Sequence, residues 1–209
     1  MFGAGQSPAA PLVICRSPRV AIIQLRHILS DRTVYPPAAR LATGGTHSSE
    51  EPGNAMKKIR LIAVGRLKRP YWKEAADHYI QRISHTARLE EVIVKDAPAG
   101  LPPPERSARE GEALLKQVRG GDCLICLDEK GKTFDSRGFA AFMGRMFETG
   151  HLPCFVIGGA YGLSPDVLAA GAHVLSLGPM TFPHELARVL LLEQVYRAES
   201  ILSGYGYHH

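Results

Sequence analysis

Two segments of the sequence combine residue types that could hold a nucleotide-like ligand. Gly158, Gly159 and Gly162 lie within five residues of one another, between an apolar run and a Ser-Pro pair. Because glycine has no Cβ, such a turn lets the backbone approach a ligand closely, although a plain tight turn would explain it equally well. Residues 177–184 (LGPMTFPH) form an apolar, proline-bounded segment, whereas connecting loops are usually exposed. Its backbone N–H and C=O groups could bind the edge of an adenine ring.

Residues near the end of the chain could bind RNA or move a proton. Arg188 and Arg197 stand nine positions apart in one predicted helix and could contact phosphate, although a solvated helix face would also explain them. The last six residues, 204–209 (GYGYHH), combine glycines, aromatic rings and imidazoles. Aromatic rings stack on unpaired bases, and imidazole can move a proton near neutral pH. A frayed terminus or the remnant of a tag is the alternative interpretation of this tail.

Several other motifs resemble known sites but lack a residue that the chemistry needs. Gly131 precedes Lys and Thr, as in a phosphate-binding P-loop, but that loop needs glycine where Cys126 stands. We therefore predict a polar turn at residues 129–132. Ser164 lacks the glycine that would complete a nucleophile elbow, so we predict that it caps a helix. Cys123 and Cys126 have no second pair of zinc ligands, so we predict two buried core thiols and no metal site.

Apolar runs alternate with stretches of helical periodicity between residues 59 and 202. This alternation predicts an α/β domain with a mostly parallel sheet, in which the fully apolar run 123–127 is a central strand. Ligands of such sheets bind beyond the carboxyl ends of the strands. That rule selects the loops after residues 127, 157 and 177. The predicted strands are 59–64, 89–94, 123–127, 154–157 and 173–177, and the predicted helices are 70–83, 105–118, 136–149, 165–170 and 185–202.

The last predicted helix, residues 185–202, carries apolar side chains over more than one face. A helix that is apolar over so wide an arc is buried on two sides. One side can pack on the core of the domain. The other side indicates a contact with a partner subunit.

Composition divides the chain near Met56. The 209 residues are 45% hydrophobic, carry a formal charge of +5 and contain four cysteines, which predicts a globular protein of the reducing cytoplasm. No run approaches the ~18 apolar residues that a membrane span needs. Residues 1–55 contain no lysine and are broken up by prolines, so we expect a disordered extension that could stem from an upstream start codon. Residues 56–209 form one domain by size.

Several ordered stretches of residues 56–209 follow the pattern of a single protein family. They are IRLIAVGRLK (59–68), Tyr71-Trp72, VIGGAYGLSPDV (156–167), LSLGPMTFPHELARVLLLEQVYRA (175–198) and the Tyr207-His208 ending. In these stretches the sequence resembles the RlmH (YbeA) family of ribosomal RNA large subunit methyltransferases. Residues 1–55 have no counterpart in that family.

The resemblance implies a fold, a reaction and a set of site residues. The family has the SPOUT fold, an α/β domain with a trefoil knot, and forms homodimers with the cofactor in the knot. Its members transfer a methyl group from S-adenosylmethionine to N3 of a pseudouridine in 23S rRNA of the assembled ribosome. By position, the resemblance places the cofactor contacts at Leu127, Gly158, Leu177, Gly178, Pro179, Met180, Thr181 and Phe182.

The implied reaction needs no metal, because the sulfonium methyl group is already activated, but the N3 proton must leave. His208 is the first candidate for the group that takes it, and His184 is the second. Arg197 and Tyr207 would position the nucleotide, with Arg188 as a further candidate. Many relatives carry Arg or Lys after the Tyr-His pair. Here His209 stands in that place and supplies a cation only when protonated.

Other functions agree with parts of the pattern. A methyltransferase of the same fold could act on tRNA instead of ribosomes. A knotted RNA-binding or ribosome-associated factor without catalysis would not bind S-adenosylmethionine. A nucleotide hydrolase is disfavoured by the incomplete P-loop and the missing metal ligands.

Overall fold

The computed structural model describes residues 56–204 of the chain. In this range the backbone builds one sheet of five strands in the order β2-β1-β4-β3-β5, and all neighbouring strands run parallel. Parallel strands need a crossover between them, and a helix supplies it in each case. The strands are β1 (Lys57–Val64), β2 (Ala87–Val94), β3 (Asp122–Lys132), β4 (Leu152–Ile157) and β5 (His173–Leu175).

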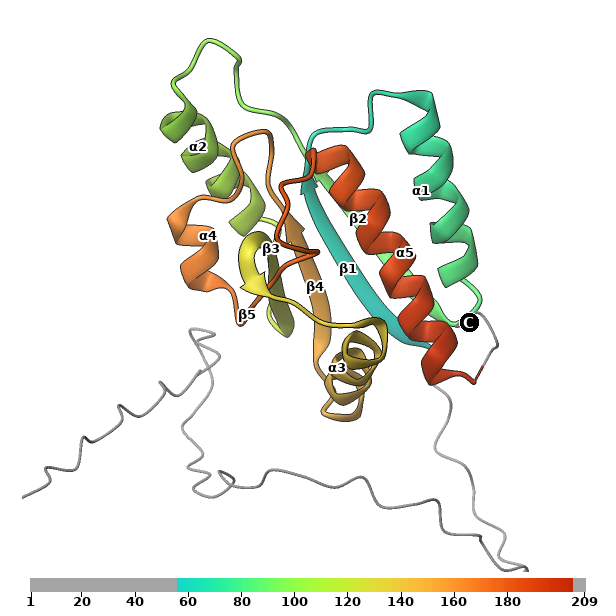
Figure 1. Ribbon diagram of the computed structural model, residues 1–209. Coiled ribbons are helices and arrows are strands. Elements are labelled where there is room, and N and C mark those ends of the chain that lie inside the picture. Colours follow the sequence, from blue (N-terminus) through green and yellow to red (C-terminus); the bar gives the residue numbers. More distant parts are fainter. Residues whose placement is uncertain (1–55, 205–209) are drawn as a thin grey trace, which may run out of the picture. The chain divides into compact units, whose positions relative to one another are not determined.

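The helices of the described range cover both faces of the sheet. Apolar residues of α1, α3 and α5 belong to one core cluster, and those of α2 and α4 belong to the other. Figure 1 shows the same three layers. The helices are α1 (Pro70–Ile83), α2 (Pro103–Leu115), α3 (Ser136–Glu148), α4 (Pro165–Ala170) and α5 (His184–Leu202).

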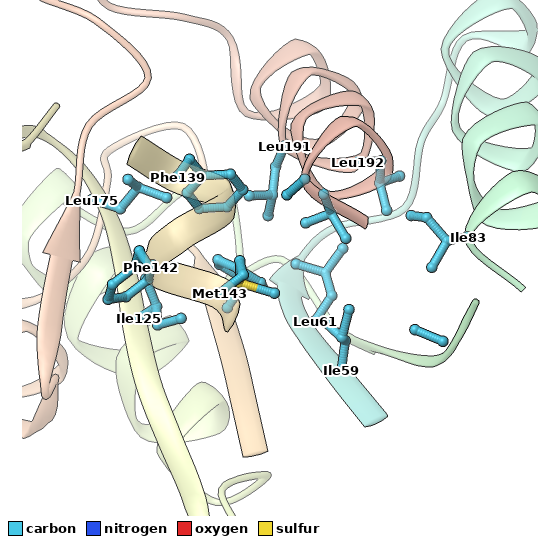
Figure 2. Close-up of a cluster of buried hydrophobic side chains, with 14 of the residues drawn as sticks. Ile59, Leu61, Ile83, Ile125, Phe139, Phe142, Met143, Leu175, Leu191 and Leu192 are labelled. Carbon is cyan, nitrogen blue, oxygen red and sulfur yellow. The ribbon is translucent and has the colours of Figure 1, made fainter. Parts of the chain in front are cut away.

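Side chains along β1 point alternately to the two faces of the sheet and therefore contribute to both core clusters. Leu61 belongs to the cluster under α1, α3 and α5, whereas the next residue, Ile62, belongs to the cluster under α2 and α4. Figure 2 shows Met143 of α3 and Leu192 of α5 among the side chains of the first cluster. Full burial of such a side chain contributes about 1.5–3 kcal/mol, so the sheet is a firm support for the loops at its ends.

The predicted strands and helices are confirmed, apart from shifts at their ends. β3 is an interior strand between β4 and β5, as its apolar sequence predicts. Cys123 and Cys126 are both buried, and they belong to opposite core clusters. This agrees with the expectation that strand residues three apart face opposite sides. Within residues 56–204, no helix has the combination of length and apolar character that spanning a membrane requires.

The polar turn predicted at residues 129–132 is wrong. β3 continues through this stretch to Lys132, with a shift of register between Leu127 and Lys132. The reason is a close contact with the following strand, where a Cβ on Gly131 would lie 2.6 Å from the carbonyl carbon of Leu175. The Ser176 N–H also donates to the Lys132 carbonyl at 3.0 Å. Gly131 therefore allows β3 and β5 to approach each other closely, and it does not form a turn.

Two further details differ from the prediction. β5 ends at Leu175 and not at residue 177, because Ser176 turns the chain out of the sheet. Ser164 occupies the N-cap position of α4, but its side chain makes no capping hydrogen bond. It is buried against α2, where a Cβ on Gly111 would lie 2.2 Å from its hydroxyl oxygen.

Candidate active site

A cavity of about 820 Å³ lies at the carboxyl ends of β3, β4 and β5. Its walls come from residues 127–130, 157–162 and 175–184, together with Ala187 of α5. These segments follow the three strand ends at which an α/β sheet is expected to bind its ligand. The volume falls within the range that small-molecule and cofactor sites occupy.

The wall after β4 is a turn that requires glycine at two positions. Gly162 has φ +74°, in the left-handed region that favours glycine. A Cβ on Gly158 would lie 2.5 Å from the carbonyl carbon of Gly162, so no larger residue fits there without a backbone shift. The Gly162 N–H donates to the Gly159 carbonyl at 3.1 Å. The turn is therefore closed on itself and presents backbone to the cavity.

Residues 176–183, the crossing loop, form the wall between β5 and α5. Ser176 anchors its start, because the hydroxyl donates to the Gly178 carbonyl at 2.8 Å and accepts the Gly178 N–H at 3.1 Å. Thr181 anchors its middle by donating to Glu129 Oε2 at 2.6 Å. Met180 lies at the cavity with an exposed side chain. The crossing loop is thus held at its start and its middle and places apolar side chains at the cavity.

Charged and polar groups lie on two sides of the cavity. Asp128, Glu129 and Lys130 line it from the end of β3, and Asp128 Oδ1 accepts the Lys130 N–H at 2.9 Å. His184 lines it from the first residue of α5, and its Nε2 is buried with no hydrogen-bond partner among the described residues. Buried polar atoms are normally paired. His184 Nε2 is therefore an exception among the polar atoms near the cavity.

The structure brings most of the predicted cofactor positions together. Except for Pro179, which stands between two lining residues, all of them line this cavity: Leu127, Gly158, Leu177, Gly178, Met180, Thr181 and Phe182. Of the residues expected to act on the substrate, Tyr207, His208 and His209 lie outside the described residues. In the described part of the chain, no group of three or more His, Cys, Asp and Glu side chains could hold a metal ion.

Arg188 is buried and bound to backbone, which differs from the expected phosphate contact. Its side chain lies inside the protein, with only 1% of the residue exposed, and Nη2 donates to the carbonyls of Gly65 at 2.6 Å and Val64 at 3.3 Å. Nη1 lies 3.6 Å from Glu91 Oε1. Burial lowers the pKa of Arg188, and the Glu91 carboxylate acts in the opposite direction. This placement favours a role in fixing α5 to the end of β1.

Arg197 lies away from the cavity. Its Nε donates to Glu193 Oε1 at 2.9 Å, and it is not among the lining residues. Nine residues of α-helix separate it from Arg188, a rise of about 13 Å. Within one copy of the chain, Arg197 is therefore not beside the cavity.

Glu110 is a buried group near the site that the sequence interpretation did not include. It is 2% exposed, and its Oε1 accepts the Ala97 N–H at 3.0 Å. Its Oε2 has no partner among the described residues and would lie 2.5 Å from a Cβ on Gly159. The available signal was its position four residues before the buried Leu114 of α2, on the inward face of the helix. The Glu110 side chain therefore packs closely against the glycine turn.

Comparison with known proteins identifies the family. The family described as "Predicted SPOUT methyltransferase" matches residues 56–208. A protein of Nitratidesulfovibrio vulgaris (strain DP4) named "Ribosomal RNA large subunit methyltransferase H" is 53% identical over 155 residues, which cover 74% of this chain and 99% of that protein. A protein of the same name from Lawsonia intracellularis is 51% identical over 154 residues, covering 73% of this chain and 98% of that protein.

Among solved structures, a probable methyltransferase from Bordetella pertussis Tohama I matches with a TM-score of 0.45 and 17% identity, over 69% of this chain and 95% of that chain. The family assignment rests on the family match and the two relatives, and not on this structural similarity. They confirm the family that the sequence resembles and the expected enzyme class, a methyltransferase. The chain therefore belongs to the SPOUT methyltransferase family.

Proposed function

We propose that this protein transfers a methyl group from S-adenosylmethionine to N3 of a pseudouridine in 23S rRNA of the assembled ribosome. The observation that carries the proposal is the relative named "Ribosomal RNA large subunit methyltransferase H", which is 53% identical over 99% of its own length. The cavity supports it, because it is lined by the same segments that the resemblance selects. Ribosomes lie in the cytoplasm, so we place the enzyme there.

The residues at the cavity fit a methyl donor of this kind. S-adenosylmethionine carries a sulfonium and an ammonium group, and the carboxylates of Asp128 and Glu129 would attract both. The backbone of the crossing loop can bind the edge of the adenine, with Met180 and Phe182 as apolar contacts. When bound, the donor supplies an electrophilic methyl group, so the chain must orient the acceptor and hold or accept a proton.

The proton of N3 needs an acceptor near the cavity. His184 offers a buried, unpartnered Nε2 there, and the proposal keeps His208 as the other candidate. Arg197 and Tyr207 would hold the nucleotide, and His209 would supply a further contact to RNA. A general base within hydrogen-bond reach of the transferred proton contributes about 10²- to 10⁴-fold to the rate.

The position of Arg197 supports a homodimer as part of the proposal. Within one copy, Arg197 lies about 15 Å along α5 from Ala187, the nearest residue of that helix at the cavity. A second copy packed on the apolar side of α5 could bring its own Arg197 and its tail, residues 205–209, to the cavity of the first. Sedimentation or light scattering at micromolar concentration should then give twice the mass of one chain. A monomer at all concentrations would contradict this part.

The function is tested by supplying the purified protein with labelled S-adenosylmethionine and three acceptors: ribosomes, free 23S rRNA and tRNA. We expect label in ribosomes, and mass spectrometry of the digested RNA should place it on a methylated pseudouridine. Label in tRNA alone would favour the same-fold tRNA enzyme. Failure to bind S-adenosylmethionine by calorimetry would favour a non-catalytic RNA-binding factor.

The proposal assigns the activity to residues 56–209. The fragment from Met56 should bind the donor and methylate ribosomes as the full chain does, because the cavity is built entirely from residues within it. Residues 1–55 lie outside the described residues, and we propose that they take no part in the reaction. Loss of methyl transfer in the fragment would show that residues 1–55 take part in the reaction.

A further inference from the structure

The connection between β1 and α1 presents a cluster of exposed basic side chains. Residues 66–73, here called the basic loop, comprise the end of the β1–α1 connection and the first turn of α1, and they contain no acidic residue. Tyr71 in the middle of the basic loop is 57% exposed, and its ring packs edge-on against Trp72 with 4.9 Å between the ring centroids. Cations next to an exposed aromatic ring are typical of surfaces that bind RNA. The exposed cations of the basic loop are Arg66, Lys68, Arg69 and Lys73.

Most of these cations lack an acidic partner in the described part of the chain. Lys68 Nζ lies 3.7 Å from Asp96 Oδ2. No acid of residues 56–204 lies within ion-pair distance of Arg66, Arg69 or Lys73. Like charges gathered in one loop repel one another. An anionic partner would remove this repulsion and gain several charge-assisted contacts.

The basic loop is fixed directly beside the cavity. The Lys68 N–H donates to Glu185 Oε2 at 3.3 Å, and the Gly65 carbonyl just before the loop accepts from Arg188 at 2.6 Å. Both partners belong to the start of α5, where His184 and Ala187 line the cavity. Figure 1 shows the β1–α1 connection and the start of α5 at the same end of the sheet.

The strand order separates the charges around the cavity. β4 lies between β1 and β3, so the glycine turn after β4 has the basic loop on one side and the carboxylates of Asp128 and Glu129 on the other. Lys130 also lines the β3 side and leaves it with one net negative charge, so phosphate groups would be attracted more strongly on the β1 side. The two sides therefore have different partners, a cationic methyl donor and a polyanion.

We propose that the basic loop holds the phosphate backbone of the RNA substrate, so that the target base crosses the glycine turn to reach the cavity. This inference rests on the proposed function and adds to it the surface that binds the RNA. Phosphate contacts release counterions, so each one makes binding more sensitive to salt.

The test compares two triple variants of equal charge. One carries Arg66→Gln, Arg69→Gln and Lys73→Gln in the basic loop. The other carries Arg88→Gln, Lys116→Gln and Arg145→Gln, which replace exposed cations at the start of β2 and the ends of α2 and α3, near the amino ends of the strands and away from the cavity. Binding to purified ribosomes is measured by co-sedimentation between about 50 and 200 mM KCl at fixed magnesium.

We expect the basic-loop variant to bind ribosomes at least tenfold more weakly at physiological salt. Its logarithmic salt dependence should be less steep by about two to three, while the control variant keeps the slope of the unchanged protein. Calorimetry with S-adenosylmethionine should give the same affinity for all three proteins, which shows that the cavity is intact. The single change Arg69→Gln should reduce the slope by about one.

The outcomes separate this inference from the function on which it rests. An unchanged slope in the basic-loop variant, while the unchanged protein methylates ribosomes, would overturn the inference alone. Equal losses in both triple variants would overturn it as well, because net charge and not the loop would then be responsible. An unchanged protein that neither binds nor methylates ribosomes would refute the proposed function and the inference together.

Discussion

At the scale of single residues, His184 is the clearest test of the proposed chemistry. The change His184→Asn keeps a polar group at the cavity wall but removes the imidazole Nε2. We expect kcat to fall about 10²-fold or more, since a general base contributes 10²- to 10⁴-fold, while the affinity for S-adenosylmethionine changes little. Steady-state methylation of ribosomes at saturating donor measures kcat, and calorimetry measures the affinity. The control is His78→Asn, an exposed residue of α1. An unchanged kcat would indicate that His208, and not His184, accepts the N3 proton.

Buried thiols give the folded protein a specific alkaline sensitivity. Burial raises the pKa of Cys126 to about 11 and, together with Asp122, that of Cys154 to about 12, from an ordinary value of 9.0. Because the folded state holds these protons more tightly, their contribution to stability is complete below about pH 9 and is lost as the pH rises through 11 and 12. We expect the free energy of unfolding in urea to fall by several kcal/mol across this range.

The matched variant for this pH effect carries Cys126→Ala and Cys154→Ala. It should be less stable at neutral pH, because it leaves small cavities in the core. Its free energy of unfolding should nevertheless decline less steeply between about pH 9 and 11. Parallel curves for the two proteins would show that other groups cause the alkaline loss.

At the scale of elements, the glycine turn after β4 is the part that tolerates least change. The change Gly158→Ala would place a Cβ 2.5 Å from the carbonyl carbon of Gly162, so the backbone must move. We expect a loss of about 1–3 kcal/mol in stability and at least a tenfold loss of affinity for S-adenosylmethionine. Gly120→Ala is the control, because nothing lies within 4 Å of its Cβ position. Normal donor binding by the Gly158→Ala protein would contradict the assigned role of this turn.

Arg188 joins α5 to the sheet, and its loss should cost more than that of Arg197 on the same helix. In Arg188→Met, the carbonyls of Val64 and Gly65 lose their donor and Glu91 loses its cation. We expect a loss of about 3 kcal/mol in the free energy of unfolding. Arg197→Met breaks the partly exposed i,i+4 pair with Glu193 and should cost less than about 1 kcal/mol. Urea unfolding measures both, and equal losses would contradict the assigned role of Arg188.

Local patterns predict the elements well, because burial imposes the period of a strand or helix on the sequence. They fail where a contact with a segment distant in the sequence determines the local structure. The stretch 129–132 has the composition of a turn, yet the backbone of Leu175 draws it into β3 through Gly131. An arginine in a helix is usually a surface residue. Arg188 is nevertheless buried, and it donates to the Gly65 carbonyl just after β1. Neither partner is near in sequence, so the pattern alone could not reveal them.

At the scale of the whole molecule, the rule for parallel sheets predicts where the cavity lies. The loops after β3 and β4 and the crossing loop meet there because parallel strands end at one edge. The position of Glu110 near the cavity depends on how α2 packs on the sheet, which no single segment encodes. The threading of the implied knot and the tail at 205–209 stay predictions.

The proposed dimer makes a prediction that only two copies together can satisfy. At a donor concentration near the Kd of the unchanged protein, a chain with Gly158→Ala should leave its donor site largely empty but keep its tail. A chain without residues 207–209 should keep the donor site, which is built from described residues far from the tail in sequence, but lack the groups that act on the nucleotide. Each protein alone should be inactive on ribosomes, and the truncated one should still bind S-adenosylmethionine by calorimetry.

If the tail of one copy serves the cavity of the other, mixing the two inactive proteins should restore methylation. Random exchange at equal amounts makes about half of the dimers mixed, and each mixed dimer joins one intact cavity to one intact tail. Activity should therefore recover to about a quarter of that of the unchanged protein, because one site in two works in half of the dimers. If each tail serves its own cavity, no mixture can combine the intact parts. Mixtures that stay inactive after proven subunit exchange would then exclude action across the interface.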